Sequence, residues 1–171
     1  MRFLALKAAE HGLSIEKLAL YEPPFIVDRG RPSTQNDWAQ IDASVAEGRR
    51  GDAVRVFLKM VGVPAFAAAL MRWLPIWAKV TAVAHTLSHD GAIVREFQRG
   101  APLPSGMCRN VTVPALVIAG GKSPAWLQNG TKALATVLSG AEYRTLEGQT
   151  HDVAAKALAP VLSQFFGSAS R

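Results

Sequence analysis

The 171-residue sequence has little of several residue types that define specialised classes of protein. Its one cysteine, Cys108, excludes an internal disulfide framework and any metal site built from several thiolates. Glycine, with 14 residues, and proline, with 10, are too few for collagen or low-complexity sequence. With 49% hydrophobic and 19% charged residues, the chain can bury the core of one ordinary soluble domain. Fibrous, disulfide-rich and disordered classes are therefore excluded.

Long hydrophobic runs are also absent. The most apolar stretch, residues 61–84, is interrupted by two prolines and two basic residues, well short of the roughly 20 apolar residues that a membrane span needs. The first residues lack the apolar core and the small-residue cleavage site of a secretory signal. We therefore expect a cytoplasmic protein with no membrane partner.

Basic residues exceed acidic ones without forming a cluster. The chain has 19 Lys plus Arg against 13 Asp plus Glu, a formal charge of +6, and its isoelectric point near 9.9 raises nucleic acid as a partner. Arg49 and Arg50 are the only adjacent bases, and no basic run is interleaved with aromatic residues. A track for phosphates and stacked bases needs such a run, so we expect no nucleic-acid binding.

The first two thirds of the chain change from a short mixed segment to a long helical one. The pattern predicts a helix over about residues 2–10 that Gly12 ends, and then a strand over residues 14–21. From residue 31 to about residue 106, apolar positions recur three and four apart, which predicts helices throughout. Residues 65–84 are apolar on nearly every side, so we expect them to be covered on more than one face.

The last third of the chain predicts a parallel sheet. Residues 111–119 form a nearly continuous apolar run, typical of a strand buried on both faces. We expect a helix capped by Ser123, a short strand over residues 141–146, and a closing helix over residues 153–166 that Pro160 interrupts or restarts. The alternation of strand and helix predicts an α/β fold with a short parallel sheet of about three strands.

Chemistry-bearing side chains follow the predicted strands. Glu22 and Asp28 come after the first strand and His151 after the third, and the carboxyl ends of parallel strands meet at one edge of a sheet. A carboxylate that orients an imidazole produces a general base, because it fixes the tautomer and stabilises the imidazolium. Glu22 stands at the strand end and is favoured over Asp28, although such a carboxylate could equally bond nearby backbone N–H groups. The set has no nucleophile.

Three local patterns imitate known sites and are rejected on physical grounds. Residues 120–123 (Gly-Gly-Lys-Ser) resemble the end of a phosphate-binding loop, but the required earlier glycine is Leu116. Residues 121–125 resemble a nucleophile elbow, yet Pro124 has no N–H to donate to an oxyanion. His85 and His89 have zinc-ligand spacing but no third ligand nearby.

The order of these segments resembles the α/β-hydrolase fold family. The resemblance rests on residues 18–25 (Leu-Ala-Leu-Tyr-Glu-Pro-Pro-Phe), the long helical insert, residues 113–124, and residues 146–151, which end in His151. It covers almost the whole chain. It implies that His151 is the catalytic histidine and that the triad acid follows either the first or the second strand, which leaves Glu22 and Asp28 as candidates.

The same resemblance implies how the chain is organised and what it lacks. Residues 1–30 and 107–171 would form a partial α/β-hydrolase core, with residues 31–106 as a helical lid insert. In the family, a G-x-S-x-G elbow with the nucleophilic serine directly precedes a helix like the first one here. We therefore expect the chain to be N-terminally truncated and inactive alone.

Two functions follow from the sequence. The resemblance implies a cofactor-free hydrolase that acts on a small ester, lactone or similar carbonyl substrate with an apolar portion. The lid residues Trp38, Phe66, Trp73 and Trp77 are candidates to line an apolar pocket, although they equally suit a helical core. The alternative is a non-catalytic binding protein that pairs the open edge of its short sheet with a partner or with itself.

Overall fold

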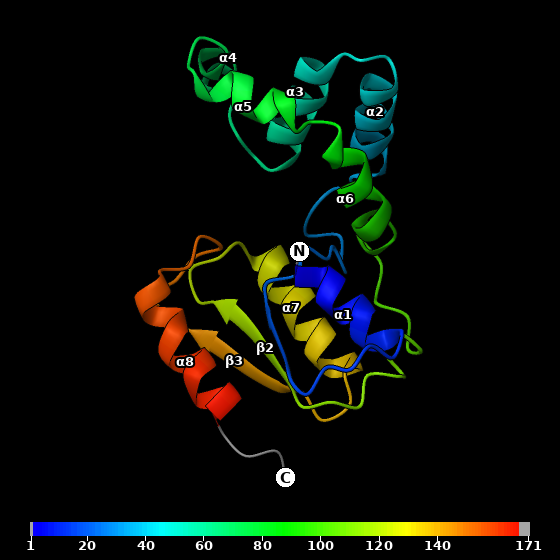
Figure 1. Cartoon of the computed structure of the whole chain (residues 1–171), viewed down its shortest axis with the longest axis vertical. Coiled ribbons are helices and arrows are strands. Elements are labelled where there is room, and N and C mark those ends of the chain that lie inside the picture. The colour runs from blue at the N-terminus through cyan, green and yellow to red at the C-terminus, as the bar shows by residue number, and fades with distance from the viewer. Residues whose placement is uncertain (1, 168–171) are drawn as a thin grey trace. The chain divides into compact units, whose positions relative to one another are not determined.

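The structure, a computed structural model, describes residues 2–167 (Figure 1). The chain divides into two compact units. Met1–Pro32 and Gly100–Arg171 make the first, here called the core unit, and Ser33–Arg99 make the second, the helical unit.

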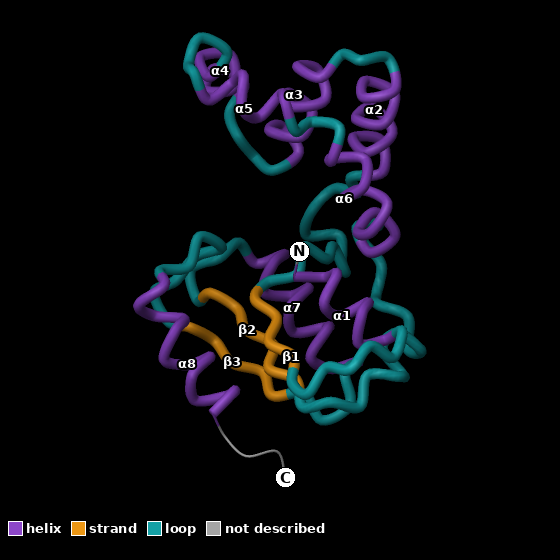
Figure 2. The backbone as a smooth tube through the Cα atoms, viewed as in Figure 1, coloured by secondary structure: helices purple, strands orange, loops and turns teal. Residues whose placement is uncertain are grey.

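The core unit contains a parallel three-stranded sheet, as the sequence predicts. Its strands are β1 (Leu18–Tyr21), β2 (Ala115–Gly120) and β3 (Glu142–Leu146), in the order β1-β2-β3 (Figure 2). Every residue of β2 is buried, which explains its continuous apolar sequence. Strands β1 and β2 each begin a few residues later than predicted, and the two are joined at their start by the bond from Leu18 N to Pro114 O.

Three helices cover the two faces of this sheet (Figure 1). Helices α1 (Arg2–Glu10) and α7 (Ala125–Val137) pack on one face, and α8 (Ala155–Gly167) packs on the other. The face under α8 is made of alternate strand residues, Ala19 and Tyr21 from β1 with Leu116 and Ile118 from β2. Side chains on either side of the sheet are therefore held by apolar packing right up to the carboxyl ends of the strands.

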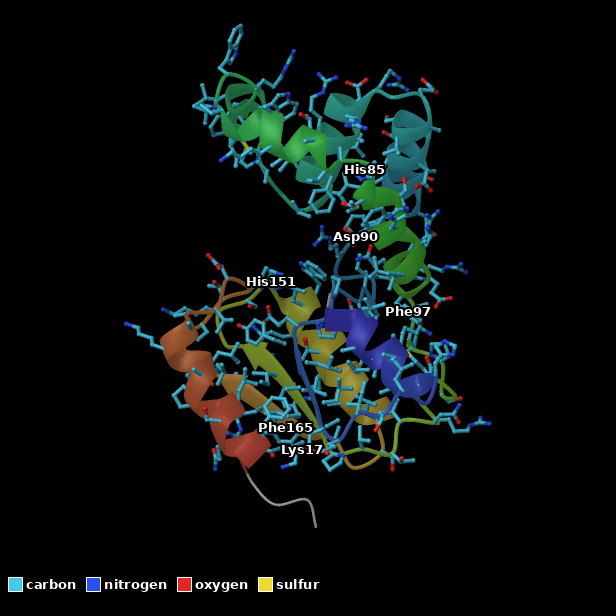
Figure 3. All side chains as sticks on the ribbon, viewed as in Figure 1. Lys17, His85, Asp90, Phe97, His151 and Phe165 are labelled. Atoms are coloured by element: carbon cyan, nitrogen blue, oxygen red, sulfur yellow. The ribbon has the colours of Figure 1, made fainter. Side chains whose placement is uncertain are left out.

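Helix α8 is also tied to the start of β1. The Lys17 ammonium donates to the carbonyl oxygen of Phe165 at 3.0 Å and lies 5.6 Å from the centre of its ring (Figure 3). A cation at the carboxyl end of a helix satisfies carbonyl groups that have no partner within the helix.

The structure confirms one predicted helix end and corrects two other details. Gly12 has φ +78°, and its N–H bonds to Ala9 O in the arrangement that closes α1. Ser123 is not the cap of α7, because Pro124 occupies the position before Ala125 and no side chain bonds to the first turn. Pro160 does not interrupt α8; it lies on the exposed side of one continuous helix, where water can reach the carbonyl that it leaves unbonded.

The regular secondary structure of the helical unit is entirely helical among its described residues, as predicted. They are α2 (Gln35–Ala46), α3 (Arg50–Met60), α4 (Ala65–Met71), α5 (Ile76–Ala82), α6 (Thr86–Val94) and a 3₁₀ turn (Arg95–Phe97). Its core gathers around Trp38, whose ring N–H donates to Gln98 Oε1 at 2.7 Å. Trp38 is 2% exposed, so it is a core residue and not a pocket lining. Within residues 2–167, no helix is long and apolar enough to cross a membrane.

Within the helical unit itself, residues 65–84 are not covered on more than one face. Phe66 is 78% exposed and Trp73 85% exposed, and Leu70 is also exposed. Helices α4 and α5 have seven residues each, and the only buried residue of the two is the small Ala68. In these two helices Ala68 is the buried residue, while Phe66, Leu70 and Ile76 stay exposed.

Candidate active site

Glu22 leaves the carboxyl end of β1 and turns its side chain over the end of β2. Its N–H donates to Ile118 O at 3.0 Å, so it extends the ladder by one residue, and its φ of +42° then turns the chain out of the strand. A left-handed backbone costs a non-glycine residue about 1 kcal/mol. The side chain is fully buried, and its Oε1 accepts the N–H of Gly120 at 2.7 Å.

His151 meets this carboxylate from the loop after β3. Its Nδ1 lies 2.9 Å from Glu22 Oε2, and 53% of its side chain is exposed. Figure 3 labels His151. A hydrogen bond from Nδ1 to an ionised carboxylate requires the tautomer with the proton on Nδ1, because such a carboxylate can only accept. The other ring nitrogen, Nε2, has no bond to any residue that the structure describes, so it can accept a proton from a substrate or a nucleophile.

Glu22 and His151 follow two strands that are not neighbours in the sheet. Strand β2 lies between β1 and β3, so the loop that carries His151 has to pass over the end of β2. Two backbone bonds fix this crossing, from Gly121 N to Leu146 O at 2.9 Å and from Lys122 N to Gln149 O at 2.8 Å. The pair is therefore assembled across three strands rather than two.

Glycine at position 120 makes this crossing possible. A Cβ atom at Gly120 would lie 2.6 Å from Gln149 O, closer than real side chains approach. It would also lie 2.7 Å from the Tyr21 hydroxyl and 2.8 Å from Ser123 Oγ. No larger residue fits between the end of β2 and the loop without moving one of them.

Further bonds hold the loop on both sides of His151. The Tyr21 hydroxyl donates to Thr150 O at 2.5 Å, and Ala154 N donates to the side-chain oxygen of Gln149 at 3.1 Å. The first contact joins residues 129 positions apart and the second joins residues five positions apart, and neither was predicted from the sequence. The signal that was available is the pair of glycines at the end of β2, which marks a close backbone approach.

Asp28, the second carboxylate candidate, is not brought to His151. Its Oδ1 accepts the N–H of Gly30 and its Oδ2 accepts from Asn129 Nδ2, both at 2.8 Å. The carboxylate thus closes a local turn and joins it to α7. The geometry pairs Glu22, and not Asp28, with His151, and Glu22 also makes the backbone bond that the alternative interpretation of this residue predicted.

Cys108 and Ser123 are two buried side chains of the core unit that are not suitable as nucleophiles. Burial raises the pKa of the Cys108 thiol to about 11, so the reactive thiolate is scarce at neutral pH. Ser123 is 5% exposed, and its Oγ is buried without a hydrogen-bond partner among the described residues. A serine that has no base beside it and no access for a substrate cannot be activated.

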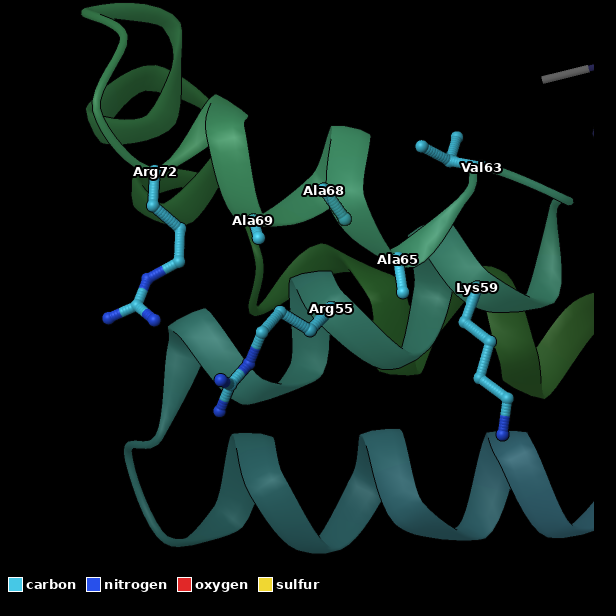
Figure 4. Close-up of a pocket in the computed structure, with 7 residues that line it drawn as sticks. All are labelled: Arg55, Lys59, Val63, Ala65, Ala68, Ala69 and Arg72. Atoms are coloured by element: carbon cyan, nitrogen blue, oxygen red, sulfur yellow. The ribbon is translucent and has the colours of Figure 1, made fainter.

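The other described histidines and the cavities do not involve the Glu22–His151 pair. His85 directly precedes α6 and His89 lies within it. No group of three or more metal-ligand side chains is present among residues 2–167. A cavity of about 310 Å³ lies in the helical unit against α3 and α4, with Arg55, Lys59 and Arg72 around an alanine surface (Figure 4). A smaller cavity of about 210 Å³ lies beneath α8. Neither is lined by Glu22 or His151.

Comparison with solved structures identifies proteins of the same fold. An alpha/beta hydrolase from Sphaerobacter thermophilus is 44% identical over 96% of this chain, with a TM-score of 0.80. The enol-lactonase of Burkholderia xenovorans is 22% identical over 98% of this chain, with a TM-score of 0.56. A 2-hydroxy-6-oxo-6-phenylhexa-2,4-dienoate hydrolase from Rhodococcus is 16% identical over 98% of this chain, with a TM-score of 0.55.

The chain spans 63%, 62% and 61% of the length of these three proteins, respectively. The second and third likenesses concern the fold alone, because their identity is low. No family model matches the sequence, and no curated protein matches it either.

Proposed function

We propose that Glu22 and His151 are the acid and the base of a serine hydrolase, because this chain belongs to the α/β-hydrolase fold family and carries both residues at the carboxyl edge of its sheet. The observation that carries the proposal is the 2.9 Å contact between His151 Nδ1 and Glu22 Oε2. The 53% exposure of the His151 side chain supports it.

The proposed mechanism is acyl transfer through a serine. His151 Nε2 takes the hydroxyl proton as the serine oxygen attacks the substrate carbonyl carbon, and Glu22 stabilises the imidazolium that forms. The imidazolium then gives this proton to the departing alkoxide, which leaves an acyl-enzyme. Water, deprotonated by the same nitrogen, attacks the acyl-enzyme carbonyl carbon, the bond to the serine oxygen breaks, and the imidazolium returns the proton to that oxygen as the carboxylic acid leaves. Proton transfer and acyl transfer are the whole chemistry, so the proposal requires no cofactor.

We propose further that the serine is supplied by residues outside this sequence, in a longer protein. The chain by itself would then be truncated with respect to catalysis and inactive, because an oriented base without a nucleophile leaves only residual catalysis. The helical unit would be the lid insert. Its exposed large side chains, including Phe66 and Trp73, suit contact with the apolar portion of a small ester or lactone.

Replacing His151 with alanine in the longer protein is expected to lower kcat for a small ester by about 10⁴-fold or more, because the serine loses its base. Release of nitrophenol from a short-chain nitrophenyl ester measures this rate. His11→Ala is the matched control, since His11 is an exposed histidine of the same unit. Full activity after His151→Ala would show that His151 is not the base.

The alternative function, binding through the sheet edge, also has an observation in its favour. Within the described residues β1 pairs with β2 alone, so its other edge has no strand beside it, and both Leu18 and Leu20 are apolar and buried as in an inner strand. Such an edge is suited to pairing with a further strand. If it pairs with a second copy, the 171-residue chain will elute as a dimer in size-exclusion chromatography with light scattering, and a monomeric mass would contradict self-association.

A further inference from the structure

Two consecutive residues at the end of β1 bind two consecutive residues of the loop after β3. The Tyr21 hydroxyl donates to Thr150 O at 2.5 Å, and Glu22 Oε2 lies 2.9 Å from His151 Nδ1. The two contacts use adjacent residues on both segments, Tyr21 and Glu22 after β1 and Thr150 and His151 in the loop. The position of the imidazole is thus determined by its own bond and by the bond that holds the preceding carbonyl.

The Tyr21 side chain is a firm anchor. It is 5% exposed and packs with Leu116 and Ile118 on the face of the sheet that α8 covers. A phenol ring that is enclosed in this way presents its hydroxyl in one place at little entropic cost. His151, by contrast, is more than half exposed and has one side-chain bond, so its own packing fixes the ring weakly.

We propose that Tyr21 is a positioning residue for His151: by holding Thr150 O, it keeps Nδ1 on Glu22 and leaves Nε2 directed to the reacting groups. The proposal rests on the proposed function of His151. Tyr21 touches neither substrate nor nucleophile in this role, and acts only through the backbone of the loop. A loop displacement of about 1 Å is enough to lower a rate by about 100-fold.

Tyr21→Phe tests the proposal, because it removes one oxygen and keeps the ring that packs under α8. The chain has two tyrosines, and Tyr143→Phe is the matched control, since Tyr143 is 37% exposed on the edge strand β3. Nitrogen-15 NMR of the imidazole reports its tautomer, and the exchange rate of the Nδ1 proton with water reports its bond to Glu22. Both can be measured in the 171-residue chain at a pH where the ring is neutral.

In Tyr21→Phe we expect a mixture of the two imidazole tautomers and an exchange rate at least fivefold higher, with Tyr143→Phe like the unchanged protein. A tautomer and an exchange rate that do not change in Tyr21→Phe would overturn the proposal. If Tyr21→Phe does not fold, fluorotyrosine at position 21 in the Tyr143→Phe background replaces it. This residue keeps the hydroxyl but makes it more acidic, so we expect slower proton exchange than in Tyr143→Phe alone, and an unchanged rate would overturn the proposal.

The activity of the longer protein gives the second readout. Tyr21→Phe is expected to lower kcat about 10-fold with KM changed by less than twofold, because the residue positions the base and does not bind substrate. An unchanged kcat together with full loss of activity in His151→Ala would overturn the role of Tyr21 while the proposed function stands. Full activity in His151→Ala would contradict the proposed function itself.

Discussion

Replacing Gly120 with alanine is expected to lower the free energy of unfolding by about 2 kcal/mol and the proposed hydrolase activity by about 100-fold. The added Cβ atom would lie 2.6 Å from Gln149 O and 2.7 Å from the Tyr21 hydroxyl. The first atom belongs to the backbone of the loop and the second to its buried anchor, so neither can rotate away. The loop has to move off the end of β2, and His151 moves with it. Urea unfolding measures the first effect and kcat/KM the second.

The neighbouring glycine provides the control. A Cβ atom at Gly121 would lie 2.9 Å from Glu147 Oε2, the far end of an exposed and flexible side chain. We therefore expect Gly121→Ala to change the free energy of unfolding by less than about 0.5 kcal/mol. If both variants are equally stable and equally active, the loop does not press on the end of β2 in the way that the distances imply.

Local sequence rules predicted the elements that depend on local physics. The continuous apolar run before residue 120 became a strand buried on both faces, and Gly12 ended α1 with a positive φ. Each of these outcomes depends on a residue and its immediate neighbours. The prediction that Ser123 caps α7 was wrong, because the helix begins one residue later than expected and Pro124 occupies the cap position.

Contacts between distant segments could not be predicted in this way. Glu22 and His151 are 129 positions apart, and only the sheet order decides that the loop must cross β2 to join them. The sequence supplied both residues and the general edge at which they meet. It did not supply Tyr21 as an anchor or Gly120 as the crossing point, because both roles depend on how three strand ends are arranged.

The sequence pattern also could not predict what covers the apolar segment of residues 65–84. An apolar segment predicts that something covers it, but not which molecule or segment does so. Within the described structure Phe66, Leu70 and Trp73 are exposed, while Ala68 supplies the packing. Under the proposed function, the apolar portion of a substrate is the occupant that this surface suits.

Replacing Glu22 with glutamine is expected to lower kcat of the longer protein by about 10⁴-fold, with a change in stability of less than about 1 kcal/mol. The amide oxygen can still accept the N–H of Gly120, so the buried turn after β1 keeps its bond. The amide nitrogen then faces His151 Nδ1 and donates to it, which forces the proton onto Nε2. A protonated Nε2 cannot take a proton from the serine, so the base is lost although its position is kept.

Asp28→Asn is the matched control, and it decides between the two carboxylates that the sequence left open. Asp28 bonds to Gly30 and Asn129 and does not reach His151, so we expect Asp28→Asn to retain kcat within about threefold. Loss of activity in Asp28→Asn with none in Glu22→Gln would transfer the role of the acid to Asp28. Loss in Glu22→Gln alone, with an unchanged urea midpoint, would show that this buried carboxylate serves the imidazole rather than the fold.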